Sequence, residues 1–561
     1  MTSRSYPGIG ASGGVAAGSA HLLNVRVSSN GGPGVVGIDE ALDAVAAELG
    51  AAADRLRDSG HGEEAEILMV GGLIALDPVL REGARAGAAQ GRDPAEAVVA
   101  AAEGHAAAME SLRDPVLRER AADIRQVGRR AAAIMRGETA ALPRGAGPFV
   151  LMALELGPAE VIGLEGGEVV AGVATRGGPN SHAAIVARTL GLPLVLGVDA
   201  SILNVAEGTA VIVDGDAGTV TLRPAEGQLA SAREAMDAAD RRRSALAGER
   251  DLPSETSDGH HVTLLCNVAT AAETAMGLEA GAEGVGLLRT ELTFLDAAGW
   301  PTEEDHRRVL EPVLRLLEGR PAIVRVLDFG GDKVPPFLAE SLPERDRGPH
   351  VRGLPALLRD PDALGAQLRA ALQAGRTCRL GILVPMVTSI REARLAREIL
   401  ERAAADTGTE APGLGAMIEV PAAAFLADRL AEEMDFLSIG TNDLTEHVLG
   451  INRRDPGARP SLAAHPSVLT LINRVARAGR EAGKSVRVCG EAASDPLVLP
   501  LLIGMGIESV SVSPARVDEV RSRVRQLSFD TCAAVAKAAM ASDAMEEVWE
   551  MVRDQCRTDL P

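Results

Sequence analysis

The sequence predicts a multidomain α/β protein, with an N-terminal α/β domain interrupted by a helical domain and a C-terminal (β/α)8 TIM barrel. Three observations favour this fold class. A helical block separates strand-like segments in the first half, a charged stretch divides the two halves, and eight apolar segments alternate with helical stretches in the second half. A chain of 561 residues also exceeds one ordinary domain.

The helical block covers residues 38–136, where Ala, Leu and Ile alternate with Glu and Arg at helical spacing. Strand-like segments lie on both sides: VAAGSAHLL before it, then FVLMAL, EVVAGVAT, LPLVLGV and AVIVDGDAGTVTL after it. We therefore expect an α/β domain made of residues 1–30 and 137–225. A helical domain, residues 31–136, is inserted near its start.

A charged stretch from Glu226 to Arg250 follows, and DLPSETSDG then breaks its helical pattern. It predicts a linker helix within residues 226–255. Beyond it, residues 256–561 hold eight short apolar strands separated by helical stretches, which is the rhythm of a TIM barrel. These strands are VTLLCNV, GVGLLRTE, AIVRVLDFG, LGILVPMV, LGAMIEV, FLSIGTNDL, SVRVCGE and ESVSVSP.

Polar side chains follow six of these eight strands, at the point where each strand ends. They are Asn267, Arg289 with Glu291, Arg325 with Asp328, Glu419, Asn442 with Asp443, and Cys489 with Glu491. Single residues of this kind are common where a strand enters a loop. Six strands ending in the same way favour an active site, because barrels build theirs at the carboxyl ends of the strands.

Composition excludes several classes of protein. A formal charge of -21 argues against a nucleic-acid binder, and we find no apolar stretch of about 18 residues that predicts membrane insertion. The start of the chain is too rich in glycine for a signal peptide. The five cysteines form no CxxC pair, which indicates a reducing cytoplasm without a zinc site or a disulfide framework.

The barrel half offers ligands for a cation and for an anion. Glu419 and Asp443 are hard oxygen donors, so Mg²⁺, or alternatively Mn²⁺, is favoured over Zn²⁺. The same half contributes Arg289, Arg325, Arg352 and Arg453, and arginine binds phosphate and carboxylate with paired contacts. This combination indicates a small, strongly anionic substrate.

Two further side chains have competing interpretations. His182, in GGPNSHAAIVAR, follows a glycine loop and precedes a helical run, so it is either a structural histidine, a metal ligand or a nucleophile that takes phosphate. Free N–H groups at a helix start favour a neutral, nucleophilic imidazole, and no second metal ligand lies at helical spacing. Cys489 is either a small buried residue or a general acid beside the anion site.

At this point the motifs resemble a known family, Enzyme I of the bacterial phosphotransferase system, the phosphoenolpyruvate–protein phosphotransferase. The similarity covers nearly the whole chain. The opening GIGASGGVAAGSA resembles that family's first strand, ERAADIRQVGRR its helical signature and GGPNSHAAIVAR its phosphohistidine motif. The segments GVGLLRTE, VRVLDFGGDK, GAMIEVPAA, LSIGTNDLTEHVL, INR and VCGE resemble its barrel motifs, in the family's order and spacing.

The resemblance implies a swivelling phosphohistidine domain in which His182 takes the phosphoryl group and passes it to the phosphocarrier HPr, docked on the helical domain. It implies that Glu419 and Asp443 hold Mg²⁺ and that Cys489 protonates C3 as pyruvate forms. It further implies a cytoplasmic protein that dimerises through the barrel, at the start of sugar transport. The implied phosphoenolpyruvate contacts are Arg289, Arg325, Arg352, Asn442 and Arg453.

The chain departs from the family pattern in two places. Asn180, Ala159 and Val161 stand where hydroxyl side chains are usual, and the loop Gly348–Arg352 is about two residues shorter than in the family. Two alternatives therefore stand beside an active phosphotransferase. One is a degenerate, non-catalytic relative that binds phosphoenolpyruvate or HPr as a sensor. The other is a dikinase or synthase, which needs a large nucleotide-binding domain that no segment here is long enough to supply.

Overall fold

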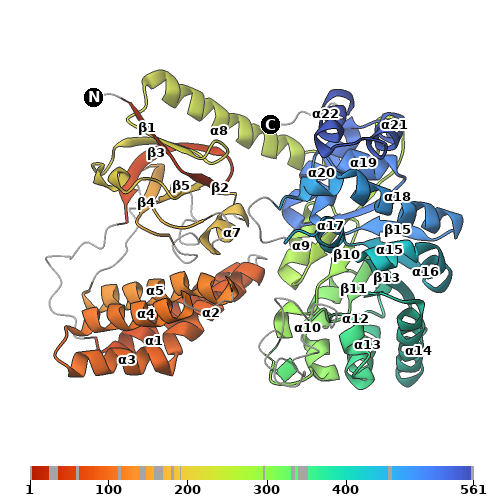
Figure 1. The fold of residues 1–561 in the computed structure, drawn as a ribbon, viewed down its shortest axis with the longest axis horizontal. Helices are drawn as coiled ribbons and strands as arrows, with labels where there is room; N and C mark the ends of the chain where they lie inside the picture. Colours follow the sequence, from red (N-terminus) through yellow and green to blue (C-terminus); the bar gives the residue numbers. More distant parts are fainter. Residues whose placement is uncertain are drawn as a thin grey trace. The chain divides into compact units, whose positions relative to one another are not determined.

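The chain forms two compact units in the computed structural model, residues 1–243 and residues 244–561 (Figure 1). The structure describes residues 3–23, 36–58, 62–110, 115–137, 147–156, 168–178, 182–189, 191–294, 297–329, 335, 337–338, 352–452 and 458–556. The sequence departures at 159, 161, 180 and 348–351 lie outside these residues, as does Arg453. The multidomain α/β fold class is confirmed.

The first unit contains one mixed sheet, in the strand order β1-β8-β7-β3-β4-β5-β6-β2 across the described residues. From β3 to β6 neighbouring strands are parallel, and the remaining pairs are antiparallel. The strands are β1 (Arg4–Pro7), β2 (Ile9–Ser12), β3 (Val15–Leu22), β4 (Phe149–Ala153), β5 (Val169–Ala174), β6 (Leu194–Leu196), β7 (Ala210–Asp214) and β8 (Thr219–Leu222).

The glycine-rich opening forms two strands where the motif suggested one. Gly13 and Gly14 separate β2 from β3, and Gly14 has φ +101°, a conformation that L side chains rarely adopt. Strands β2 and β3 then take separate places in the sheet. β2 pairs with β6 at one edge, whereas β3 lies between β7 and β4. A strand-period pattern could not reveal this break, since apolar residues lie on both sides of it, Ile9 and Ala11 before and Val15 and Ala16 after.

Between β3 and β4 the chain forms the expected helical block. Because β3 and β4 are hydrogen-bonded neighbours, the helices are an insertion that leaves the sheet and returns to it. The helices are α1 (Ile38–Asp58), α2 (Gly62–Leu76), α3 (Pro78–Ala89), α4 (Pro94–Glu110) and α5 (Pro115–Met135). After the sheet comes the predicted linker helix, α8 (Glu226–Ala247).

The second unit is a closed barrel of parallel strands, as predicted. Each of the eight apolar segments named from the sequence forms one strand, and β16 pairs with β9 to close the ring. The strands are β9 (Thr263–Val268), β10 (Val285–Leu288), β11 (Pro321–Arg325), β12 (Arg379–Val384), β13 (Gly413–Ile418), β14 (Phe436–Ile439), β15 (Ser485–Val488) and β16 (Ser509–Val512).

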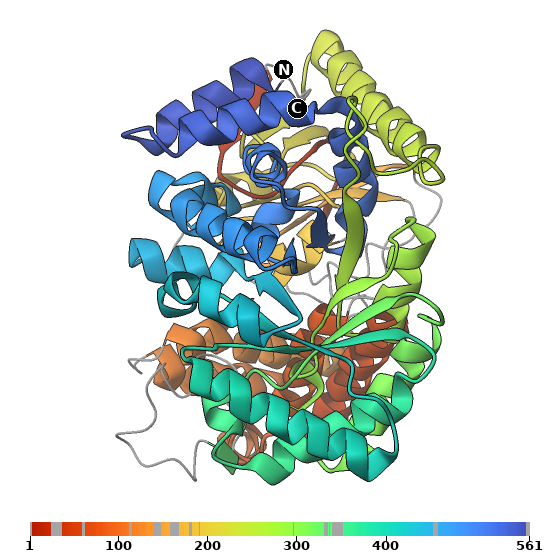
Figure 2. The ribbon, with the colours of Figure 1, turned by 90° about the vertical axis from the view of Figure 1, so that its right-hand side faces the viewer.

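Helices surround the barrel strands, and their apolar faces pack against the outside of the ring (Figures 1 and 2). The α-helices are α9 (Ala271–Glu279), α10 (Glu303–Arg315), α12 (Leu354–Leu357), α13 (Pro361–Ala374), α14 (Ile390–Thr407), α15 (Pro421–Phe425), α16 (Ala427–Glu433), α17 (Thr441–Leu449), α18 (Pro466–Glu481), α19 (Leu499–Gly504), α20 (Val517–Gln526), α21 (Phe529–Ala539) and α22 (Met545–Gln555). Inside the ring a smaller apolar cluster forms the floor below the strand ends: Leu287, Ile323, Leu383, Met417, Phe436 and Cys489.

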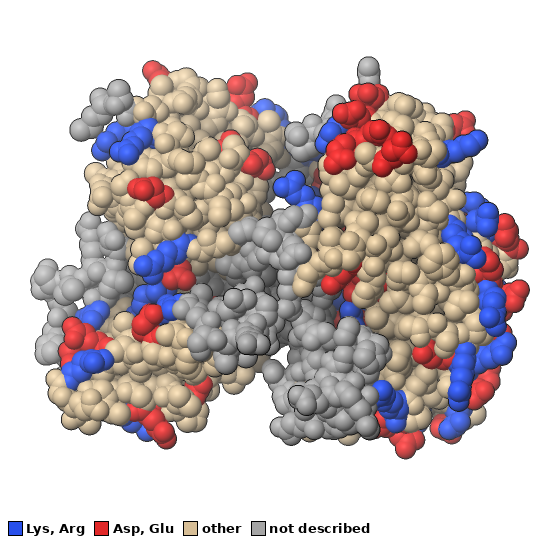
Figure 3. All heavy atoms as spheres, viewed as in Figure 1, with Lys and Arg blue, Asp and Glu red and all other residues tan. Residues whose placement is uncertain are grey.

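On the surface, charges of both signs alternate along the outer barrel helices (Figure 3). Arg394 pairs with Glu433 and Arg474 with Asp428, so these basic side chains stand beside acidic ones. Within the described parts of the chain, no helix combines the length and the low polarity that a membrane crossing requires.

Candidate active site

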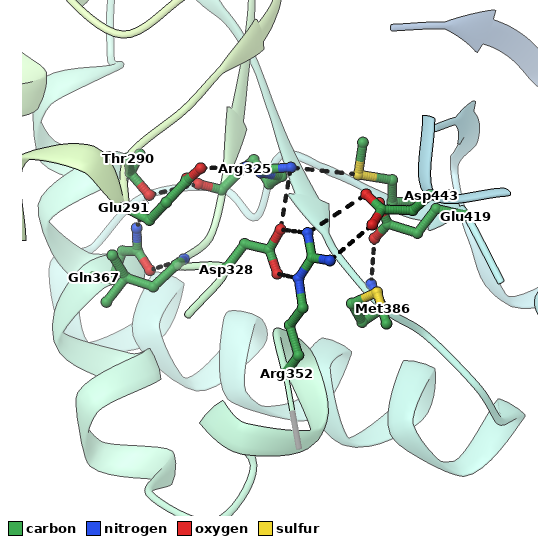
Figure 4. Close-up of polar contacts among 11 residues, drawn as sticks. Thr290, Glu291, Arg325, Asp328, Arg352, Gln367, Met386, Glu419 and Asp443 are labelled. Carbon is green, nitrogen blue, oxygen red and sulfur yellow. Dashed lines mark hydrogen bonds and ion pairs between the residues drawn. The ribbon is translucent and has the colours of Figure 1, made fainter. Parts of the chain in front are cut away.

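The candidate active site lies where the barrel strands end, and its polar side chains are paired with one another (Figure 4). Glu291 follows β10, Arg325 ends β11 and Glu419 follows β13. Asp443 stands in the first turn of α17, directly after β14. The barrel topology alone brings these groups together, because parallel strands deliver all their carboxyl ends to one face.

Arg325 is buried and held by two carboxylates. Its Nη2 donates to Glu291 Oε1 at 2.6 Å, and its Nη1 lies 3.4 Å from Asp328 Oδ2. Burial alone would lower the pKa of Arg325, but the charges of Glu291 and Asp328 outweigh it and raise that pKa. The guanidinium is therefore permanently charged and fixed in direction at the mouth of the barrel.

Arg352 lies between two carboxylates from different elements. Its Nε and Nη2 donate to Asp328 Oδ1 and Oδ2 at 3.0 and 2.8 Å. Its Nη1 and Nη2 face Asp443 Oδ1 and Oδ2 at 2.8 and 3.4 Å. Asp328 thus contacts both arginines, so it positions the two guanidinium groups relative to each other.

Glu419 is completely buried, and its two carboxylate oxygens differ. Oε1 accepts a hydrogen bond of 2.7 Å from the backbone N–H of Met386, whereas Oε2 has no hydrogen-bond partner. Burial, and then the charges of Asp328 and Asp443, raise the pKa of Glu419 to about 8. Glycine is needed beside it, because a Cβ on Gly440 would lie 2.9 Å from the Glu419 Cβ atom.

The predicted cation fits this pair of carboxylates. An unpartnered, buried carboxylate oxygen is costly unless a positive group completes it, and Glu419 Oε2 is such an atom. Mg²⁺ is typically bound by one or two protein carboxylates together with water and substrate phosphate. The described residues contain no group of three or more acidic, His or Cys side chains that could enclose a metal, so Glu419 and Asp443 would share the cation with other ligands.

Cys489 follows β15 and points into the barrel, where it joins the apolar floor. Ser438 Oγ donates to its sulfur at 3.3 Å, and the thiol faces the carbonyl of Ile439 at 3.6 Å. Burial raises the pKa of Cys489 to about 11, although the Ser438 hydroxyl acts in the opposite direction. The thiol is therefore protonated at neutral pH, as a proton donor has to be.

The structure gives less detail for three further predicted residues, Asn442, Arg289 and His182. Asn442 is the second residue of α17, and its Oδ1 accepts from the backbone N–H of Glu491 at 3.0 Å. The Arg289 amide donates to the carbonyl of Val268 at 2.8 Å, directly after β10. His182 is the first residue of α7 (His182–Thr189) in the first unit, and only its backbone belongs to the described part of the chain.

Glu291 and Asp328 follow predicted strands, but neither is among the predicted site residues. Met386 is not predicted either; it has a positive φ of 56° and turns its N–H toward Glu419. The same holds for Gln367, whose side chain donates to Thr290 Oγ1 and accepts from the backbone N–H of Leu327. Only the first two carried a signal, their position after an apolar strand.

Family models cover most of the chain. The PEP-utilising enzyme, PEP-binding domain, matches residues 243–529, just over half of the chain. The mobile domain of PEP-utilising enzymes matches residues 145–218, which include His182. The N-terminal PEP-utilising enzyme model matches residues 7–120. All the barrel residues discussed above lie within the first of these matches.

Individual relatives extend the similarity to nearly the full chain. The phosphoenolpyruvate-protein phosphotransferase of Streptomyces coelicolor is 36% identical over 556 residues, 96% of this chain and 97% of that protein. The protein of the same name from Latilactobacillus sakei is 32% identical over 98% of both chains. The multiphosphoryl transfer protein of Xanthomonas campestris is 38% identical, but this chain spans only 66% of its length. The chain therefore belongs to the phosphoenolpyruvate–protein phosphotransferase family of PEP-utilising enzymes.

Proposed function

We propose that the protein moves the phosphoryl group of phosphoenolpyruvate to His182 and then to the phosphocarrier HPr, releasing pyruvate. The observation that carries this proposal is the barrel mouth, where buried Arg325 and partly buried Arg352 are oriented by carboxylates beside the uncompensated Glu419. Fixed guanidinium groups bind phosphate and carboxylate, the two anionic groups of phosphoenolpyruvate.

The chemistry divides between the two units. The imidazole of His182 forms a bond to phosphorus, the bond from phosphorus to the enol oxygen breaks, and that oxygen keeps the electron pair. The enolpyruvate left in the barrel takes a proton at C3 from the Cys489 thiol and becomes pyruvate. Arg325, Arg352, Arg289, Arg453 and Asn442 are the proposed phosphoenolpyruvate contacts.

Mg²⁺, or Mn²⁺, held by Glu419 and Asp443 would neutralise charge on the substrate oxygens when bound. Glu419 has a further part in this arrangement. With Oε1 fixed by the Met386 amide, its Oε2 is held in one direction. The carboxylate is thus oriented before any ligand arrives, which lowers the cost of ordering the site.

For HPr, the helical insertion offers an exposed apolar face. Met69, Leu73 and Leu76 of α2 are 45%, 56% and 47% exposed, and Val79 at the start of α3 is 64% exposed. The three α2 residues are spaced by four and three positions, so they share one side of the helix. Large apolar side chains gathered on a surface typically mark a protein-binding site. Dimerisation through the barrel and a cytoplasmic location complete the proposal.

Incubation with labelled phosphoenolpyruvate and Mg²⁺, without nucleotide, tests the function. We expect an acid-labile, base-stable phosphoprotein, as phosphohistidine requires. A degenerate sensor would bind phosphoenolpyruvate without becoming labelled. Label that appears only when a nucleotide is added would indicate a dikinase or synthase instead.

A further inference from the structure

Arg487 places a positive charge inside the barrel, close to the floor that contains Cys489. It lies in β15, two residues before Cys489, and alternate residues of a strand face the same side of the sheet. The strand pairing continues to that point, because the Cys489 N–H donates to the Ile439 carbonyl at 3.1 Å. The guanidinium of Arg487 lies 4.6 Å from the ring centroid of Phe436, another residue of the floor. Arg487 and the thiol therefore share the inner face of the barrel wall.

The charge of Arg487 is not balanced by an ion pair. Its Nε and Nη1 are buried, and neither has a hydrogen-bond partner. Within the described parts of the chain, no carboxylate pairs with this guanidinium, and the charge that acts on it is that of Cys489. Arg325 also acts on the thiol, but Glu291 and Asp328 already balance it. Because arginine stays charged and an unpaired buried charge is costly, Arg487 would gain from a negative group nearby.

Cys489 becomes such a group when it acts as the proton donor. The proton passes to C3 of enolpyruvate, the electron pair of the S–H bond stays on sulfur, and the negative charge moves from the enolate to a thiolate. Burial raises the pKa of this thiol to about 11, and the Ser438 hydroxyl acts against it. The charge of Glu419 raises the pKa as well, whereas those of Arg325 and Arg487 lower it. A thiolate in this floor therefore depends on its neighbouring cations.

We propose that Arg487 is a positioning residue of the reaction, whose unpaired guanidinium stabilises the thiolate that Cys489 becomes after protonating C3. The side chains of alternate strand residues are about 7 Å apart, and charges at this distance still interact strongly inside a protein. Arg487 precedes Cys489 along the strand, so it lies on the side of the thiol away from the barrel mouth. This inference rests on the proposed function, because it takes Cys489 as the proton donor.

The first measurement follows the thiol without substrate and without turnover. Iodoacetamide reacts with the thiolate form, so the rate at which it modifies Cys489, followed by peptide mass spectrometry, reports the thiolate fraction. Arg487→Met keeps an unbranched side chain but removes the charge. We expect modification at about pH 9 to slow by about threefold to tenfold. One pKa unit lowers the thiolate fraction about tenfold, and the greater nucleophilicity of the remaining thiolate offsets part of this. Arg487→Lys keeps the charge and should react like the wild type.

The direction of the change separates charge from packing. If Arg487 served only to cover Phe436, its loss would loosen the floor, expose the thiol and speed its modification. Arg474→Met is the matched control, because Arg474 also lies near a phenylalanine ring, that of Phe425, but on the outer helix α18. This variant should modify Cys489 at the wild-type rate. Arg487→Gln is a second neutral variant and should slow modification even if the methionine variant does not fold. Unchanged or faster modification in the neutral variants overturns the inference.

Pyruvate formation connects the thiol to the reaction. It should slow in Arg487→Met by about the same factor as thiol modification, and Arg487→Lys should restore it. Unchanged pyruvate formation in the neutral variants, together with slow turnover of Cys489→Ala, rejects the role of Arg487 alone. Normal turnover of Cys489→Ala rejects the proton donor of the proposed function, and the role of Arg487 with it.

Discussion

The two units of the chain carry their candidate reactive groups in opposite ways. In the first unit, His182 belongs to one continuous motif of the sequence and is the first residue of α7. In the barrel, the site is assembled from residues far apart in sequence, such as Arg352 and Asp443, which are 91 positions apart. A candidate nucleophile can therefore be specified by local sequence, whereas a site of balanced charges requires the complete fold.

The largest effect is expected when the imidazole of His182 is removed. His182→Ala should abolish phosphate incorporation from phosphoenolpyruvate completely, because no other residue is proposed to take the phosphoryl group. The barrel of the same variant should still bind phosphoenolpyruvate with wild-type affinity, measured by calorimetry. Wild-type labelling of the variant would show that the nucleophile lies elsewhere.

Removal of the cation by chelation tests the proposed role of the barrel. EDTA should abolish phosphoryl transfer from phosphoenolpyruvate to His182, because it removes the cation that we propose for Glu419 and Asp443. Protein already phosphorylated on His182 should still pass its phosphate to HPr, since we propose that this step involves only the first unit. Equal loss of both steps, each followed with labelled phosphate, would contradict the division of labour between the units.

The fold was predictable from the sequence because its signals are local. Each barrel strand is a short apolar segment, and polar residues such as Glu419 and Asp443 follow these segments at positions that the barrel brings together. The pairings within the site were not predictable. Nothing in the sequence shows that Asp328 contacts both arginines, or that the Met386 backbone turns toward Glu419. Such contacts depend on loop conformation and on distances across the barrel.

Substitution of Cys489 tests the proton transfer that we propose for the barrel. Loss of a general acid typically costs 10²- to 10⁴-fold in rate, so Cys489→Ala should slow pyruvate formation by roughly that factor. Phosphate exchange between His182 and HPr should be unaffected. If Cys489 only packs against the barrel floor, the variant would instead lose about 1 kcal/mol of stability and keep its turnover. Turnover, exchange and melting temperature measured together distinguish these results.

The exposed face of α2 tests whether HPr recognition belongs to the first unit alone. Leu73→Glu places a charge among apolar side chains at a position that is 56% exposed. We expect the KM for HPr to rise about tenfold, which corresponds to about 1.4 kcal/mol of binding free energy, while pyruvate formation from the first turnover stays unchanged. Leu316→Glu, at an exposed leucine of the barrel, is the matched control and should leave the KM for HPr as in the wild type.

The smallest expected effect concerns the stability of the barrel and the buried His306. This histidine lies in α10 against Phe294, is 1% exposed, and neither ring nitrogen has a hydrogen-bond partner. Burial lowers the pKa of His306 from 6.5 to about 4. Between pH 6.5 and about 4, the imidazole of His306 is therefore protonated in the unfolded chain but neutral in the folded barrel. The stability that this difference contributes is complete above pH 6.5 and is lost as the pH falls toward 4.

At pH 5.5, one unit below the unfolded pKa, the loss amounts to about 1.4 kcal/mol. His306→Leu removes the titrating group, so the free energy of unfolding of the variant should fall less between pH 7.5 and 5.5 than that of the wild type, by about this amount. Leucine also leaves no polar atom unsatisfied at this buried position. Chemical denaturation followed at both pH values measures the difference, with the exposed His261→Leu as control. Parallel pH dependences of wild type and His306→Leu would mean that His306 is charged within the folded barrel, and the apolar packing around α10 would then have to accommodate an imidazolium.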